Sequence, residues 1–401
     1  MKNNLICLIF ISISTFSCKV EKSSNEVFFQ DISECKNIET LRYGDKSFFD
    51  TCYVIKLETS YKSILASISQ LEICNDTLYI YDAQTERIKV FNTSGHYLMD
   101  FAEKGNGHGE YLSISSFFID EDKHNLCIID PLKQAIHTYT TSGKYLNSIK
   151  NKSHYLSKIK KASVVDSMNI ICSLATSWED DNYQLIILDP MTYSIKEILS
   201  AYPFKSPLYE STSISKSPFA VHDDEIHYLR FLSDTVYSYR KAERYLFKKG
   251  QDIRSSGNLK SLAKQLNYDY FRLITKISKE GTYSTGYNNI YESNRFILLE
   301  YSAGQFKDRG FLWDKHKSTG YNIENYTDYL PDFGSITFSK NDLFVRIWNN
   351  DAISAFKSST NKSVKNSYPK EIWNIVDNHD FDNDNPLLIV YKMNKCGSGS
   401  L

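Results

Sequence analysis

The chain lacks the features that most directly identify a nucleic-acid-binding protein or a common enzyme. Its 401 residues include 47 Lys and Arg against 48 Asp and Glu, which leaves a formal net charge of −1. A chain so nearly neutral has no electrostatic preference for nucleic acid or anionic lipid as its main partner. The sequence also contains no G-x-S-x-G, H-E-x-x-H or phosphate-binding P-loop motif. Composition and motifs therefore leave the reaction or ligand, if there is one, unspecified.

Proline and paired cysteines are also scarce. The chain has 8 Pro and 8 Cys. Six of the cysteines follow the N-terminal leader, without a C-x-x-C pair or a regular spacing: Cys35, Cys52, Cys74, Cys127, Cys172 and Cys396. A chain of this length does not need disulfides for stability, so free or buried thiols are expected. A disulfide among the first three of these cysteines is the alternative.

The apolar run at the N-terminus is too short to cross a membrane. It covers Leu5–Phe16, about a dozen residues, whereas a transmembrane helix needs about 20. The basic Lys2 before it and the small Ser17 after it complete the pattern of a secretory signal. Residues 15–18 resemble a bacterial lipobox, which implies that Cys18 is lipidated and anchors the protein to a membrane without crossing it. An ordinary cleaved signal with an incidental cysteine is the alternative.

Aromatic residues are abundant, and one pattern of residues occurs twice. The 29 Tyr and 23 Phe favour half-buried sheet surfaces. Asp82 and Asp130 lie 48 positions apart, and the segments around them, 77–98 and 125–146, align without a gap. A fixed period of about 40–50 residues built from short strands is typical of the blades of a β-propeller.

Each copy of the pattern predicts short strands joined by tight turns. Leu78 and Ile80 alternate with their neighbours as in a strand that buries one face. Asp82 ends this strand and can cap the turn that follows. Gly95, 48 positions before Gly143, supplies the positive φ of a hairpin turn. One such sheet cannot hide its apolar side chains alone, so it must stack against others like it.

The segment that joins the two copies carries a family resemblance. It reads Gly-Asn-Gly-His-Gly-Glu-Tyr over Gly105–Tyr111. Together with the repeated I-x-D, I-x-x-[FY] and S-G-x-[YF] pattern, it resembles the six-bladed β-propeller lipoproteins of Bacteroidetes, which are relatives of NHL-repeat propellers. The usual connector of that family reads G-x-G-P-G-E-[YF], and His108 stands here in place of its proline. The resemblance implies an all-β, six-bladed propeller, lipid-anchored in the cell envelope, with the outer membrane as its expected location.

The chain divides into a leader, a tether, a propeller and a tail. We expect a lipoprotein signal peptide over 1–18, a flexible tether over 19–30, the propeller over 31–395 and a tail over 396–401. The six blades are expected over the ranges 68–101, 114–149, 164–200, 219–249, 281–321 and 334–358. We expect the N-terminal strand Tyr53–Leu57 to complete the last blade, beside Leu343–Phe356, so that no sheet edge stays open. Helical spacing and capping residues also predict two short inserted helices, Leu259–Leu266 and Pro369–Asn378.

The connector loop is the first candidate ligand-binding site. Gly105 and Gly107 permit a tight backbone that could aim N–H groups at an anion or a sugar hydroxyl, with His108 and Glu110 beside them. Glycine-rich phosphate loops lead into a helix, however, whereas this one leads into a strand-like segment. The alternative is a connector between blades in which Glu110 holds neighbouring backbone N–H groups.

Two clusters could bind a divalent metal, and no other cofactor is expected. His222, Asp224 and His227 combine residue types that hold metal ions in proteins. Asp380–Asp384 resembles the start of a calcium loop, although the glycine and the final glutamate of such a loop are missing. Solvated turns are the alternative for both clusters.

Four aromatic residues could present a sugar-stacking surface or could pack between blades. They are Trp178, Tyr209, Trp313 and Trp348. Aromatic faces suit the apolar faces of sugars, but large aromatic side chains also fill the interfaces of an all-β fold.

The leading functional hypothesis is a monomeric binding protein of the cell envelope. It would use one propeller face to hold a glycan, a peptide or a protein partner, and would touch the membrane only through its lipid. The alternative is a metal-dependent lyase or hydrolase with its site at the mouth of the axial channel. Three or more His, Asp or Glu side chains converging on one axial point would favour the enzyme.

Overall fold

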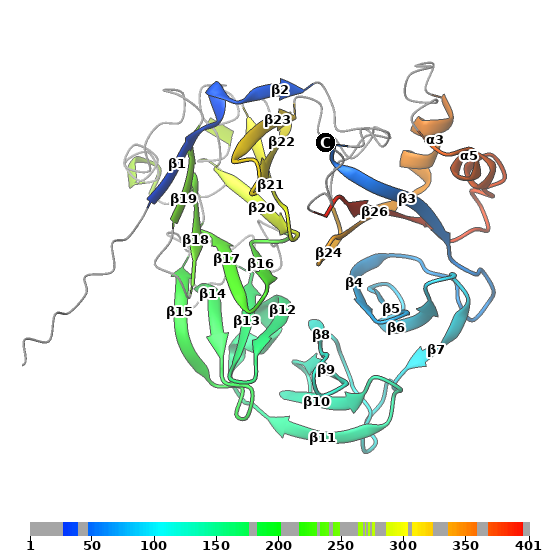
Figure 1. Cartoon of the computed structure of the whole chain (residues 1–401). Coiled ribbons are helices and arrows are strands. Elements are labelled where there is room, and N and C mark those ends of the chain that lie inside the picture. The colour runs from blue at the N-terminus through cyan, green and yellow to red at the C-terminus, as the bar shows by residue number, and fades with distance from the viewer. Residues whose placement is uncertain are drawn as a thin grey trace, which may run out of the picture.

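The computed structural model is a ring of six β-sheets around a central axis (Figure 1). In each sheet the first strand lies next to the axis and the following strands lie progressively farther out. The predicted all-β, six-bladed propeller is therefore confirmed. The structure describes a few positions between 264 and 276 and the residues 27–38, 47–175, 183–201, 216–230, 233–239, 244–248, 286–303, 307–323, 336–358 and 368–395.

The first three blades each contain four antiparallel strands. Blade one consists of β4 (Ile68–Cys74), β5 (Thr77–Asp82), β6 (Arg87–Asn92) and β7 (Tyr97–Phe101). Blade two consists of β8 (Ser116–Asp120), β9 (Asn125–Asp130), β10 (Ala135–Thr140) and β11 (Tyr145–Lys150). Blade three consists of β12 (Ile159–Asp166), β13 (Asn169–Leu174), β14 (Tyr183–Leu188) and β15 (Ile195–Ala201). Its inner strand starts ahead of the predicted boundary at residue 164.

The last three blades follow the same plan. Blade four consists of β16 (Phe219–His222), β17 (Glu225–Leu229), β18 (Thr235–Ser238) and β19 (Arg244–Lys248). Blade five consists of β20 (Tyr287–Glu292), β21 (Phe296–Ala303), β22 (Lys307–Asp314) and β23 (Thr319–Ile323). Blade six consists of β24 (Phe338–Lys340), β25 (Leu343–Trp348), β26 (Leu387–Met393) and β3 (Phe49–Lys56).

An N-terminal strand closes the ring, as predicted. β3 is the outermost strand of blade six and runs antiparallel to β26, with Tyr53 opposite Val390. Its direct neighbour is thus β26, while the predicted neighbour β25 lies one strand further in. Strands from near both ends of the chain meet in this blade, so the sheet hydrogen bonds of blade six hold the ring together.

Two further N-terminal strands cover the outer edges of blades four and five. β1 (Val27–Asp31) runs parallel to β19, and β2 (Lys36–Ile38) runs parallel to β23. Between them, Ile32 is 1% exposed and belongs to the core between these two blades. Phe28 packs against Trp313 with ring centroids 4.9 Å apart. Residues 27–30 are therefore part of the propeller and not of the predicted tether, because apolar side chains such as Phe28 gain by leaving water.

The hydrophobic core is divided into six clusters, one between each pair of neighbouring blades. In β5, Leu78 and Ile80 belong to the cluster shared with blade six, whereas Tyr79 and Tyr81 belong to the cluster shared with blade two. All four side chains are buried. The prediction that this strand buries one face is therefore wrong: the alternation is real, but a different neighbour covers each face.

A buried carboxylate ends the second strand in both copies of the repeat. Asp82 accepts hydrogen bonds from the N–H groups of Ser67 at 2.9 Å and Gln84 at 3.1 Å. Asp130 accepts hydrogen bonds from the N–H groups of Leu112 at 2.6 Å and Lys133 at 3.0 Å, on the connector and the turn of blade two. The predicted cap of the following turn is confirmed, and the same carboxylate also fastens the connector that enters the blade.

In the described residues between β25 and β26, two inserted helices pack outside blade six (Figure 1). α5 (Lys370–Asp377) begins directly after Pro369, as predicted. α3 (Asn350–Ser358) lies where the sixth blade was expected to continue. It forms because Asn349 caps its first turn and Phe356 packs on Trp348, with ring centroids 4.8 Å apart.

The predicted helix over 259–266 lies largely outside the described residues. No helix in the described part of the chain is long and apolar enough to span a bilayer. Five described cysteines are free thiols, as expected, and the alternative disulfide is not formed: Cys35, Cys52, Cys74, Cys127 and Cys172. Cys18 and Cys396 lie outside the described residues.

Candidate functional site

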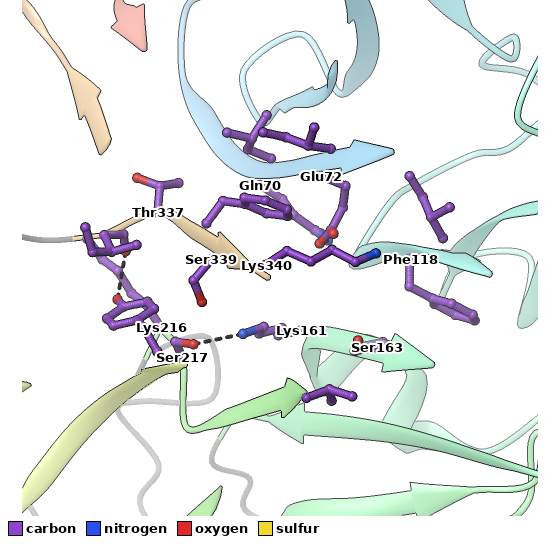
Figure 2. A pocket seen from close by; sticks show the side chains of 18 of the residues that line it. Gln70, Glu72, Phe118, Lys161, Ser163, Lys216, Ser217, Thr337, Ser339 and Lys340 are labelled. Atoms are coloured by element: carbon purple, nitrogen blue, oxygen red, sulfur yellow. Dashed lines mark hydrogen bonds between the residues drawn. The ribbon is translucent and has the colours of Figure 1, made fainter. Parts of the chain in front are cut away.

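The axis of the ring is a polar channel with a volume of about 1120 Å³. The inner strands of all six blades line it: β4, β8, β12, β16, β20 and β24. Its size is comparable to that of small-molecule binding sites. Figure 2 shows side chains from several blades pointing into this space. Because each lining strand is fixed in a sheet, the ring positions these side chains rigidly.

Lys161 of β12 is a half-buried ammonium group inside the channel. Its Nζ donates to the Oγ of Ser217 at 2.8 Å (Figure 2). It also donates to the carbonyl oxygen of Phe219 at 3.2 Å. The same nitrogen lies 4.6 Å from the centre of the Phe219 ring. Burial lowers the pKa of Lys161 to about 8, and the charge of Glu72 opposes this shift only in part.

Glu72 of β4 is the acidic group in this part of the channel. Its Oε1 accepts a hydrogen bond from Nε2 of Gln70 at 3.2 Å. Gln70 is held in turn by the backbone of Phe117 in blade two, at 2.6 and 3.2 Å. Burial raises the pKa of Glu72 to about 7, while the Gln70 hydrogen bond and the charges of Lys161 and Lys340 act in the opposite direction. The channel thus contains an acid and an amine that both titrate near neutral pH.

An ion pair crosses one end of the channel. Nζ of Lys340, at the end of β24, lies 2.6 Å from Oε1 of Glu121, which follows β8. These residues belong to blades six and two, with blade one between them. Figure 2 shows Lys340 extended across the opening. An exposed pair of this kind contributes little stability, so its main effect is to narrow this end of the channel.

Hydroxyl groups make up much of the remaining wall. Seven serine and threonine residues line the channel: Ser67, Ser69, Ser115, Ser163, Ser217, Thr337 and Ser339. Together with Gln70, Glu72 and Lys161, they offer many hydrogen-bond donors and acceptors. Such a lining suits a polar ligand that carries a charged group.

The predicted ligand loop, Gly105–Tyr111, is not among the residues that line this channel and is folded on itself. Oε2 of Glu110 accepts a hydrogen bond from the N–H of Gly107 at 2.6 Å, and the N–H of Gly105 donates to a carbonyl within the loop at 2.8 Å. A Cβ at Gly105 would lie 2.2 Å from Oε2 of Glu110, so the carboxylate occupies the space that a side chain would take there. His108 packs edge-on against a tyrosine of blade two. These contacts agree with the alternative interpretation, in which the loop connects two blades and Glu110 holds neighbouring backbone N–H groups.

The three residues of the predicted metal site do not converge. His222 and Asp224 line the channel. His227 is 4% exposed, and its Nδ1 lies 2.6 Å from Oε2 of Glu292 in blade five. Lys315 binds the other carboxylate oxygen of Glu292 at 2.8 Å. No group of three or more His, Cys, Asp or Glu within the described ranges is arranged to hold a metal ion.

The acidic segment Asp380–Asp384 uses its carboxylates within its own turn. Asp380 accepts hydrogen bonds from the N–H groups of Asp382 and Asn383 at 3.0 and 3.3 Å. Asp384 forms an ion pair with Lys56 of β3 at 2.8 Å. This turn therefore fastens the last strand to the closing strand, as an acidic connector would.

The described aromatic candidates pack in the core. Trp313 is 3% exposed and Trp348 is fully buried. They belong to the clusters between blades four and five and between blades five and six. Trp178 and Tyr209 lie outside the described residues.

Blade two contains a serine, a histidine and an aspartate in the order of a catalytic triad. Nδ1 of His137 lies 2.6 Å from Oγ of Ser148, and Nε2 lies 3.4 Å from Oδ2 of Asp130. The hydroxyl of Tyr145 lies 2.7 Å from the same Oγ. Taken alone, this chain of contacts suggests an activated serine.

Blade one shows that the same contacts are structural. The positions 48 residues earlier hold Lys89, Asp100 and Tyr97. Lys89 and Asp100 form an ion pair at 3.1 Å, and the Tyr97 hydroxyl donates to Asp100 at 2.8 Å. The two blades thus build one hydrogen-bonded framework from different polar pairs, which identifies it as packing and not as a nucleophile.

Lys161 and Glu72 belong to no motif that the sequence displays. The available signal is a charged residue inside an otherwise uncharged inner strand, such as Glu72 in β4. Lys160 and Lys161 fall outside the predicted third blade because that blade was expected to begin at residue 164. The channel wall is also assembled from six separate strands, so no local spacing reveals it.

Two solved structures share this architecture. A protein from Bacteroides fragilis, described as exported, superposes with a TM-score of 0.69 at 17% identity, covering 92% of this chain and 100% of its own. A member of the DUF4221 family from Bacteroides vulgatus gives a TM-score of 0.50 at 11% identity, covering 86% of this chain and 97% of its own. At these identities the similarity concerns the fold alone. No curated protein matches the chain.

The family assignment comes from the sequence itself. Residues 16–392 match a family described as a domain of unknown function, DUF4934. The matched region contains the closing strand and the inner strands of all six blades. The chain therefore belongs to the DUF4934 family.

Proposed function

We propose that the protein is a binding protein of the bacterial cell envelope that holds a polar ligand in its axial channel. The observation that carries this proposal is the channel wall, in which hydroxyl, amide and charged groups from six blades surround a volume of about 1120 Å³. A volume of that size fits a short saccharide or a short peptide. A protein partner would contact the channel mouths instead.

The envelope location is supported by the leader and by a structural neighbour. Residues 1–18 have the pattern of a lipoprotein signal, and the Bacteroides fragilis protein with the same fold is described as exported. Lipid on Cys18 would keep the propeller at a membrane surface. We expect wild-type protein expressed with a labelled fatty acid to carry the label and to sediment with membranes. Cys18→Ser should lose both properties, and a variant that retained the label would contradict the lipid anchor.

Ligand binding is tested on the purified full chain in detergent. We expect members of a panel of envelope saccharides and short peptides to raise the melting temperature, since a ligand that binds only the folded state stabilises it. Ser163→Phe should block this effect, because Ser163 lines the channel (Figure 2). Ser142→Phe is the matched control, because Ser142 lies in an exposed turn of blade two.

The outcome separates the channel from other surfaces. A ligand whose binding survives Ser163→Phe would bind outside the channel and contradict this proposal. The metal-dependent alternative has no cluster of three ligating side chains to support it within the described ranges.

A further inference from the structure

We propose that Lys161, held in place by Ser217, is a subsite for a carboxylate group of the ligand. This inference rests on the proposed binding role of the channel and assigns the chemistry of what the channel binds. The carboxylate has two natural sources, a uronic acid in a saccharide and the C-terminus of a peptide.

Lys161 has no counter-charge in contact. Its Nζ touches only a hydroxyl, a carbonyl oxygen and an aromatic face, and it forms no ion pair with any described carboxylate. Three other cations withdrawn from solvent do have one: Lys89 with Asp100 at 3.1 Å, Arg295 with Asp314 at 2.6 Å and Lys315 with Glu292 at 2.8 Å. A desolvated ammonium without a carboxylate is costly, and an anionic ligand would offset that cost.

Lys161 also has an unused hydrogen-bond donor. An ammonium group has three N–H bonds, and the contacts to Ser217 and Phe219 account for two of them. The Ser217 hydroxyl accepts from Lys161 and has carbonyl acceptors for its own proton at Ile290 and Phe219, 3.1 and 3.3 Å away. Ser217 is therefore a positioning residue that aims Lys161, while the third N–H of Lys161 remains for a ligand.

The charges around this site also bear on what Lys161 can bind. The titratable groups that face the channel from neighbouring elements include Glu72, Glu121, Lys216, His222, Glu292 and Lys340. Lys340 pairs with Glu121, and Lys315 and His227 pair with Glu292. Glu72 is the acid that acts on the charge of Lys161, and because its pKa is about 7, it can take up a proton when an anion arrives. Carboxylate binding near pH 7 should therefore be accompanied by proton uptake.

The experiment compares matched charged and neutral probes by calorimetry on the purified full chain. Glucuronate is paired with glucose, and N-acetylalanine with its amide, all at millimolar concentration. We expect one carboxylate to bind at least about tenfold more tightly than its neutral partner, the scale of one unscreened charge contact. The saccharide and peptide pairs distinguish the two sources of the carboxylate. Binding enthalpies that vary with the ionisation enthalpy of the buffer would report the proton uptake.

Substitutions assign the preference to Lys161. Lys161→Met should abolish the tenfold preference, and Lys161→Arg should keep most of it. Lys196→Met is the control, because Lys196 lies on the exposed outer strand of the same blade. In the wild type the preference should fall as the pH rises through about 8, where free Lys161 loses its proton.

Two results would overturn the inference. One is a charge preference that Lys161→Met leaves intact. The other is the absence of any carboxylate binding by the folded wild type. Neither result decides whether the channel binds ligands. That proposal is tested separately, by whether Ser163→Phe blocks the ligands that do bind.

Discussion

Gly95 and Gly143 hold the same turn in successive blades but meet different neighbours. Their φ values are +87° and +93°, so both need a residue that tolerates the left-handed region. A Cβ at Gly95 would lie 2.1 Å from the carbonyl oxygen of Lys56 in the closing strand. At Gly143 the nearest atom would be the terminal methyl of Met99, 3.1 Å away. A side-chain end can move aside, whereas a backbone oxygen in a sheet cannot.

Alanine substitutions should therefore differ in cost. We expect Gly143→Ala to lower the free energy of unfolding by about 1 kcal/mol, mainly through backbone strain. Gly95→Ala should lower it by roughly 2–4 kcal/mol, because it also displaces the closing strand. Urea denaturation of both variants measures the difference. Equal losses would mean that the contact with Lys56 does not matter.

Glu292 is the residue whose ionisation stabilises the interface between blades four and five. Burial opposes that ionisation, but His227 and Lys315 outweigh it and hold the pKa of Glu292 at about 2. An unfolded glutamate titrates near about 4.3, so the folded state is favoured fully above that pH. The contribution is lost as the pH falls from there towards 2.

Glu292→Gln should remove this pH dependence. Near pH 6.5 the variant should be less stable than the wild type, on the order of 3 kcal/mol. Between pH 4.5 and 2 it should lose less stability than the wild type does. Denaturation at a series of pH values measures both slopes, and parallel slopes would contradict this assignment.

At the scale of elements, the repeat predicted the strands well where it is regular. Blades one and two match the expected ranges because alternation, buried aspartates and turn glycines agree there. The helix α3 was not predicted. Its apolar residues Ala352, Ile353 and Phe356 follow a strand directly, and no proline or glycine marks the end of that strand. The pairing of β1 with β19 was not predicted, because it depends on an edge that exists only after blade four has formed.

Because blades one and two share one hydrogen-bonded framework, the Lys89–Asp100 pair of blade one can be introduced at the equivalent positions of blade two. His137→Lys and Ser148→Asp each place one half of the blade-one pair in blade two. We expect each single change to destabilise the protein by about 1–3 kcal/mol, because it leaves a buried polar group without its partner. The double variant should recover much of that loss, with a coupling energy of about 1–3 kcal/mol. Simple additivity in a denaturation cycle would contradict the equivalence of the two frameworks.

At the scale of the whole molecule, fold and function differ in how far the sequence reveals them. The number of blades and the closing strand follow from a repeat and from one family resemblance. The channel chemistry does not, because lining residues such as Ser67, Lys161 and Lys340 are far apart in the sequence. Their neighbourhood exists only once the ring is closed.

Ring closure should depend on β3 and much less on the strands before it. A chain that begins at residue 39 lacks β1 and β2 but keeps β3 paired with β26. We expect it to fold cooperatively with a lower melting temperature, since it loses mainly edge strands. A chain that begins at residue 57 lacks the closing strand and should not unfold cooperatively. Scanning calorimetry distinguishes them, and similar behaviour of the two would contradict this hierarchy.

The placement of β1 and β2 would have a mechanical consequence if the proposed lipid on Cys18 holds the protein by its N-terminus. Tension that enters there reaches β1 first and β2 second, because they precede β3 along the chain. Both lie on outer edges of their sheets, so each can detach without breaking the hydrogen bonds between β3 and β26. Detachment of the two strands under load would lengthen the N-terminal segment between the membrane and the propeller. The ring and its channel would stay intact.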